Sequence, residues 1–125
     1  MSTAILDAGA LIAFERNDRF VVAIVARALK HHDPLVVPAG VVAQTWRDGR
    51  RQTRLARLLG SQICTVLALD DHAARAAGQL CGTTGISDIV DASVVIAARS
   101  HHGRVITSDP DDIRRLDNDL AIVSV

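Results

Sequence analysis

Four aspartates stand where the chain is expected to leave a strand or enter a helix. Asp7 directly follows a short apolar segment, and Asp109 comes just after another one. Asp88 and Asp91 open a long apolar segment and lie three residues apart, which places both on one face of a helix. Because ligands bind beyond the carboxyl ends of the strands in an open parallel sheet, these carboxylates are predicted to gather at one edge.

Such a group of carboxylates favours metal chemistry. Two like charges at about 4 Å repel by about 4 kcal/mol at an effective dielectric near 20, and a divalent cation removes that cost. Ligands that are all oxygen select Mg²⁺ or Mn²⁺. Zinc is not expected, since neither Cys64 nor Cys81 has a partner at zinc-ligand spacing. The chemistry suited to this site is phosphodiester hydrolysis, in which the metal activates water.

Each of these aspartates also has a simpler interpretation. Asp7, Asp88 and Asp109 are good N-cap residues, and Asp91 suits the positive end of a helix dipole. Taken alone, each is more often a cap than a ligand, but their occurrence together favours a site. Six other aspartates are expected to be caps or to face solvent, although one of them, Asp112, could reach the site from the helix after Asp109: Asp70, Asp71, Asp111, Asp112, Asp117 and Asp119.

The net charge of zero conceals a basic segment and an acidic one. Residues 44–57 carry five arginines against one aspartate, and residues 70–119 carry nine aspartates against five arginines. If the basic segment is helical, four arginines cover an arc of about 100° and could hold RNA phosphates: Arg47, Arg50, Arg51 and Arg54. A solvated helix face or salt bridges to the acidic half explain them equally well. Gly49 weakens the assumption of one continuous helix.

The chain of 125 residues is long enough for one domain with a hydrophobic core. With 49% hydrophobic and 22% charged residues it is globular in composition. No signal peptide or membrane-spanning segment is visible, and both cysteines are expected to be reduced. We therefore expect a soluble, cytoplasmic protein. The near absence of aromatic residues argues against RNA binding on stacked aromatic platforms.

Short apolar segments alternate with longer helical ones, which predicts an α/β fold with a parallel sheet. Strands are predicted at 3–6, 35–37, 63–69, 104–107 and 121–123. Helices are predicted at 10–14, 19–32, from Pro38 through Trp46 to Leu59, from 70 or 71 to 81, from 87 or 88 to 101, and after Asp109. Residues 82–85 are predicted to be a loop. Trp46 is interpreted as a packing residue.

Three segments resemble a known family. Residues 5–11 (ILDAGAL), 91–98 (DASVVIAA) and 105–109 (VITSD) are similar to the three acidic motifs of PIN-domain ribonucleases, in the same order. More narrowly, the chain resembles the toxin half of VapBC toxin–antitoxin pairs over its whole length, 1–125. The resemblance implies a PIN-like three-layer α/β/α sandwich with a central parallel sheet. It also implies a Mg²⁺ or Mn²⁺ site, cleavage of structured RNA, and a homodimer inhibited by a small cognate antitoxin.

The chain departs from the family at one position. The helix after the second strand usually carries a Glu, and here that residue is Gln44. Gln keeps an oxygen ligand but loses the charge, and Asp88 could restore it. The sequence therefore predicts a metal-dependent endoribonuclease toxin. Its metal ligands would be Asp7, Asp91 and Asp109, with Asp88 and Gln44 completing the pocket.

Two other functions were weighed. A degenerate PIN domain would bind RNA or a protein partner without cutting, and Gln44 makes this alternative credible. A phosphorylated receiver-type domain also ends its first strand in Asp. It requires a paired acid there and a Lys late in the chain, whereas Ala8 and Gly9 follow Asp7 and the one lysine is Lys30. The receiver-type domain is therefore not favoured.

Overall fold

The structure is a computed structural model that describes residues 2–125. Five strands and seven helices follow one another along the chain: β1 (Ala4–Leu6), α1 (Ala8–Glu15), α2 (Arg19–His31), β2 (Leu35–Pro38), α3 (Ala39–Thr45), α4 (Thr53–Leu59), β3 (Cys64–Leu67), α5 (Asp71–Thr84), α6 (Ile89–His101), β4 (Arg104–Thr107), α7 (Pro110–Leu116) and β5 (Ile122–Ser124).

All five strands are parallel and form one sheet in the order β3-β2-β1-β4-β5. β1 is the central strand, and Ile5 pairs with Val36 on one side and with Val105 on the other. The chain builds outward from β1 to β3, then crosses to the other side of β1 to form β4. The strand order therefore reverses between β1 and β4, and this is where an open parallel sheet forms its ligand crevice.

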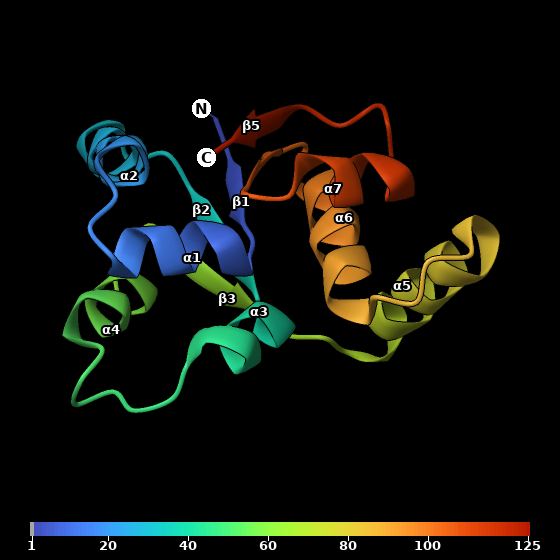
Figure 1. The fold of residues 1–125 in the computed structure, drawn as a ribbon, viewed down its shortest axis with the longest axis horizontal. Helices are drawn as coiled ribbons and strands as arrows, with labels where there is room; N and C mark the ends of the chain where they lie inside the picture. The colour runs from blue at the N-terminus through green and yellow to red at the C-terminus, as the bar shows by residue number, and fades with distance from the viewer. Residues whose placement is uncertain (1) are drawn as a thin grey trace.

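Helices cover both faces of the sheet, which confirms the predicted α/β/α sandwich. α6 packs against β1, β2 and β4, while α1 packs against β1 and β4 and is itself covered by α2, α3 and α4. In Figure 1, α5, α6 and α7 lie to one side of the sheet and α1, α2 and α4 to the other. α6 is buried nearly all round from Ala92 to Ala98, because it crosses the middle of the sheet.

Most predicted elements are confirmed, and several boundaries are corrected. The predicted helix from Pro38 to Leu59 is wrong as one element, because α3 ends at Thr45 and α4 begins at Thr53. Pro38 is the last residue of β2 and the N-cap of α3. α5 continues through most of the predicted loop to Thr84, where Gly85 ends it with a positive φ of 74°.

The remaining differences are small. β3 is shorter than predicted, and α1 is longer.

Both cysteines are free, and burial raises the pKa of the Cys64 thiol to about 11. Among residues 2–125, no single helix has the length and hydrophobicity to span a membrane; α5 and α6 reach both only as a pair, which is bent by 111°.

Candidate functional site

Asp7 is a buried carboxylate fixed at the end of the central strand. It is the N-cap of α1, and its Oδ1 accepts a hydrogen bond of 2.9 Å from the Ala10 amide. Its side chain also hydrogen-bonds with Thr107. The residue is only 6% exposed, and this burial raises the pKa of Asp7, with Asp109 adding to the effect and both hydrogen bonds opposing it. Asp7 is therefore a cap and a member of a charged group at once.

Thr107 connects Asp7 to Asp109. It is the last residue of β4 and is fully buried. Its hydroxyl accepts a hydrogen bond of 2.9 Å from the Asp109 amide, which leaves the hydroxyl proton for the Asp7 carboxylate. One threonine thus sets the position of both strand-end aspartates. Thr107 was not among the predicted site residues, although its position at the end of the predicted strand, two residues before Asp109, places it at the same edge of the sheet.

Gly9 allows α1 to approach the end of β4. A Cβ at this position would lie 1.9 Å from Ser108 Oγ and 2.8 Å from Ser108 Cβ. Real Cβ atoms essentially never come this close, so a larger residue would push the first turn of α1 away from residue 108. The glycine therefore keeps Asp7 and Asp109 on neighbouring segments in range of each other.

Asp88 and Asp91 form the second half of the acidic group. Asp88 is the N-cap of α6, and its Oδ1 accepts a hydrogen bond of 2.9 Å from the Asp91 amide. Burial raises the pKa of Asp91 to about 6, and the nearby charges of Asp88, Asp7 and Asp112 contribute. Asp91 therefore lies within electrostatic range of three other carboxylates, one at its own helix cap and two from distant parts of the chain.

A cavity of about 290 Å³ opens beside Asp91. It lies between the end of α5, the start of α6 and the exposed face of α7, and its lining includes Asp88, Asp91, Asp112 and Arg115. The sequence analysis expected Asp112 to be solvated but within reach of the site. In the structure its side chain is 51% exposed and still lines this acidic cavity.

The other predicted site residues do not line this cavity, and Asp7 and Asp109 are among them. Gln44 is exposed near the end of α3, one turn after Gly40. At Gly40 the helix lies close to the start of α6, because a Cβ there would lie 3.2 Å from Val90 Cγ2. Arg47, Arg50 and Arg51 lie in the turn between α3 and α4, and Arg54 lies on α4 in a groove with α2. The four arginines thus share no continuous helical face, which corrects the arc predicted from the sequence.

The acidic group matches a hard divalent cation in its chemistry, and it is only partly preassembled. All of its side-chain donors are carboxylate oxygens, the ligands that Mg²⁺ and Mn²⁺ prefer. The pKa values of Asp7 and Asp91 are raised mainly by burial and further by neighbouring carboxylates, so a bound cation would relieve an electrostatic cost. Within residues 2–125, no three His, Cys, Asp or Glu side chains are placed closely enough to hold one metal ion. Side-chain rotation would have to complete such a site.

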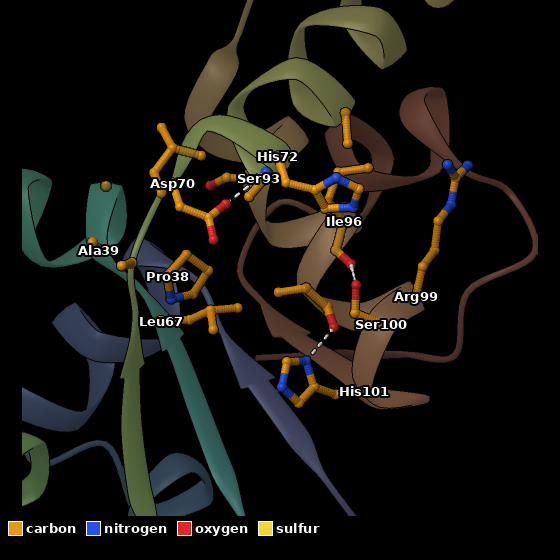
Figure 2. Close-up of a pocket in the computed structure, with 16 residues that line it drawn as sticks. Pro38, Ala39, Leu67, Asp70, His72, Ser93, Ile96, Arg99, Ser100 and His101 are labelled. Carbon is orange, nitrogen blue, oxygen red and sulfur yellow. Dashed lines mark hydrogen bonds between the residues drawn. The ribbon is translucent and has the colours of Figure 1, made fainter.

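A larger cavity, of about 390 Å³, lies elsewhere. Figure 2 shows it between the ends of β2 and β3 at Pro38 and Leu67, the start of α5, and the side of α6. Two of its polar side chains contact the helix that carries them: the Ser100 hydroxyl donates to the carbonyl oxygen of Ile96, and the His101 ring lies 3.0 Å from the carbonyl oxygen of Ala97. The lining is mainly apolar, so the smaller acidic cavity is the better candidate for hydrolytic chemistry.

Several solved structures share this fold. VapBC2 from Rickettsia felis bound to a promoter DNA fragment aligns with a TM-score of 0.70 at 13% identity over 98% of each chain. FitAcB from Neisseria gonorrhoeae has a TM-score of 0.65 at 19% identity, over 97% of this chain and 96% of the other. VapC20 of Mycobacterium tuberculosis, named as a Sarcin-Ricin loop cleaving toxin, has a TM-score of 0.63 at 15% identity. The alignment covers 87% of this chain and 93% of the other.

Identities this low show similarity of fold. No curated protein is a significant sequence match to the chain. The family model named PIN domain matches residues 4–119, which include all three acidic segments and the whole sheet except β5. On that match, the chain belongs to the PIN domain family.

Proposed function

We propose that this PIN domain is a metal-dependent endoribonuclease, the toxin of a VapBC-type pair, which cleaves structured RNA by phosphodiester hydrolysis. One observation carries the proposal. Asp109, Asp7 and Asp91 form a series of electrostatically coupled carboxylates at the point where the strand order reverses, and Asp88 and Asp112 extend it. Asp7 is buried, Asp91 lines a cleft, and both have raised pKa values, which is typical of a functional site.

Asp7, Asp91 and Asp109 would hold Mg²⁺ or Mn²⁺. The bound ion would supply an activated water molecule and stabilise negative charge on the phosphate. The chain itself orients the carboxylates: the Thr107 hydroxyl and the Ala10 amide hold Asp7, and the Thr107 hydroxyl also holds the backbone at Asp109. Before an ion binds, Asp91 holds a proton only below about pH 6, the value to which burial and the neighbouring carboxylates raise its pKa. Asp88 would add a negative charge beside Asp91, and Gln44 would add a neutral oxygen from α3.

RNA as the substrate is supported by the fold and by the basic turn. VapC20, which shares the fold, is named as a toxin that cleaves the Sarcin-Ricin loop. In the present chain, Arg47, Arg50 and Arg51 lie in an exposed turn, where they could contact phosphates without reading sequence. Arg54, on the adjacent helix, is proposed as a fourth contact.

An antitoxin partner is supported by the complexes among the solved structures and by an apolar groove. Rickettsia felis VapBC2 and Neisseria gonorrhoeae FitAcB share the fold. In this chain, the groove between α2 and α4 is lined by Phe14, Leu29 and Leu58 and flanked by Arg54 and Arg57. Such a surface would suit an amphipathic segment with acidic residues. A cytoplasmic homodimer is the assembly that we propose for the toxin.

The test is cleavage of a structured RNA by the purified chain. We expect cleavage with Mg²⁺ or Mn²⁺, none with chelator, and none by Asp91→Asn with either metal. Residual cleavage in chelator at the same rate would contradict metal dependence. Cleavage by Asp91→Asn equal to that of the native chain would point to a contaminating nuclease.

A degenerate PIN domain remains the second candidate, and two observations favour it. Gln44 is neutral where the family usually has Glu, and no three acidic, His or Cys side chains among residues 2–125 are preassembled for one ion. Under this alternative the chain binds RNA in chelator and in metal with the same affinity and cuts in neither.

A further inference from the structure

Arg115 is the one positively charged side chain among the described residues that line the acidic cavity. It lies in the last turn of α7, and the other ionisable groups of the lining are Asp88, Asp91 and Asp112. Its Nη1 lies 3.3 Å from Oδ1 of Asp112, one turn earlier on the same helix. A cation is therefore tethered at the rim of a cavity that is otherwise acidic.

The neighbouring residue provides an internal comparison. Arg114 makes an equivalent pair with Asp111, at 3.4 Å and with the same spacing of three residues. This second pair does not line the acidic cavity. α7 thus carries two similar ion pairs, of which one faces the candidate site and the other does not.

The Arg115–Asp112 pair is suited to exchange its partner. The two side chains are 67% and 51% exposed, and exposed ion pairs of this kind contribute little to stability. The bond uses one of the five N–H donors of the guanidinium group, and no other acceptor for Arg115 is found among residues 2–125. A phosphate can take two parallel hydrogen bonds from the same group, which is a stronger interaction than the single bond to Asp112.

Without a bound metal ion, RNA meets an unfavourable charge at this site. A phosphodiester that approaches Asp91 meets three carboxylates, and like charges repel. The basic turn at Arg47, Arg50 and Arg51 lies on the connection between α3 and α4 and does not line this cavity. A phosphate held beside Asp91 therefore has Arg115 as its cation in the lining.

We propose that Arg115 is an RNA-positioning residue, whose guanidinium group leaves Asp112 and binds an RNA phosphate at the rim of the acidic cavity. The proposal deepens the function proposed above and rests on RNA being the ligand. It assigns Asp112 the role of holding Arg115 over the cavity before RNA arrives. The role of Arg115 is binding, and it takes no part in bond breaking.

The experiment measures binding of a structured RNA to the full chain in chelator, over a series of salt concentrations. Arg115→Gln is expected to weaken binding about tenfold at low salt and to lower the slope of log K against log salt by about one, because one phosphate contact is lost. Arg115→Lys should restore part of the affinity, since it returns the charge without the planar fork. Arg114→Gln, which removes the same charge from the same helix, should leave the slope unchanged.

The outcomes separate this inference from the nuclease proposal. Equal salt slopes for Arg115→Gln and Arg114→Gln would overturn it, as would a native chain that does not bind RNA. If the chain binds RNA without cutting, the effect of Arg115→Gln on the slope still decides the inference. If it cuts, Arg115→Gln should raise KM with little change in kcat. Unchanged melting temperatures of all three variants would show that each one folds.

Discussion

The acidic group and the arginine segment differ in how the fold holds them. Asp7 is 6% exposed and is tied to Ala10 and Thr107, whereas the side chain of Arg50 is 92% exposed. The acidic side chains start from strand ends and helix caps, which are fixed by the backbone. The arginines start from a turn between two short helices. Backbone anchoring and burial therefore give Asp7 and Asp91 a defined position and raised pKa values, while the arginines of the turn are exposed to solvent.

The turn that carries the arginines is itself organised by one side chain. Gln52 Oε1 accepts hydrogen bonds from the amides of Arg47 and Asp48, at 2.7 and 2.9 Å. Its side-chain amide donates to Glu15 at the end of α1 and to the carbonyl of Thr45. Trp46 lies against Gly49, where a Cβ would lie 2.7 Å from the indole ring, but the tryptophan is 38% exposed. The turn backbone is held, and two of its arginine side chains make local contacts: Arg47 Nη1 donates to the carbonyls of Ala43 and Trp46, and Arg50 lies 3.4 Å from Asp48.

The largest expected effect comes from removing a charge in the acidic group. Asp7→Asn, Asp91→Asn and Asp109→Asn should each lower RNA cleavage at least about a hundredfold, because Asn keeps the shape and capping ability but loses the charge that a hard cation requires. The matched control is Asp18→Asn, since Asp18 caps α2 through bonds of 3.1 Å to Phe20 and Val21. Cleavage kinetics measure both. Full activity of Asp7→Asn would remove the metal-site assignment.

The second prediction concerns stability without metal. Asp91 has a pKa of about 6 in the folded chain, above the ordinary value of 3.8, so the folded state binds more protons between these values. The native chain should therefore lose stability as pH rises from about 4 to about 6. Asp91→Asn should avoid this loss and gain about 1–2 kcal/mol above pH 6, after allowance for solvent screening at a half-buried group.

Thermal unfolding in chelator checks this prediction. At pH 7.5 the melting temperature of Asp91→Asn should exceed that of the native chain by about 3–6 °C. At pH 3 and below the difference should vanish, because Asp91 is then mostly protonated in both states. Asp18→Asn should show no such pH-dependent gain. A lower melting temperature of Asp91→Asn at pH 7.5 would indicate that Asp91 serves the helix dipole alone.

The third prediction divides the arginine segment. Arg51→Glu should weaken RNA binding about tenfold at low salt and flatten its salt dependence, because it reverses a charge in the exposed turn. Arg57→Glu should leave RNA binding unchanged and weaken binding of the antitoxin, because Arg57 flanks the groove between α2 and α4. Arg54 borders both regions. Whether Arg54→Glu weakens binding of RNA or binding of the antitoxin therefore shows which surface Arg54 belongs to. Equal effects of Arg51→Glu and Arg57→Glu on RNA would mean that the segment acts only through its total charge.

The smallest expected effect is at Gln44. Gln44→Glu should raise metal affinity by a few-fold at most, about 1 kcal/mol or less, because Gln44 is exposed and Asp88 and Asp112 already supply negative charge. In the Asp88→Asn background the gain should be larger. A double-mutant cycle on Mn²⁺ affinity measures the coupling. Strict additivity would contradict compensation by Asp88, and no effect in either background would place Gln44 outside the site.

Sequence patterns were sufficient for the parallel sheet and for the acidic residues at its edge. The short apolar segments predict strands because most apolar residues must be buried, and a sheet covered on both faces buries them. The aspartates come directly after these segments, where the chain leaves the strand. β4 begins and ends where it was predicted, at Arg104 and Thr107. α6 was recognisable because its body is apolar nearly all round. These features depend on residues close together in the chain, so local patterns reveal them.

Only the tertiary structure decided how distant segments combine. The Thr107 bond to Asp7, the contact of Gly9 with Ser108 and the position of Arg115 over the acidic cavity join residues that are far apart in sequence. The break between α3 and α4 likewise depends on Gln52 bonding to Glu15, 37 residues away. The apolar pattern allows a helix through this segment apart from Gly49, and a part-buried long-range hydrogen bond stabilises the turn instead. The sequence determined which groups reach the edge of the sheet, and packing between distant segments determined which of them meet.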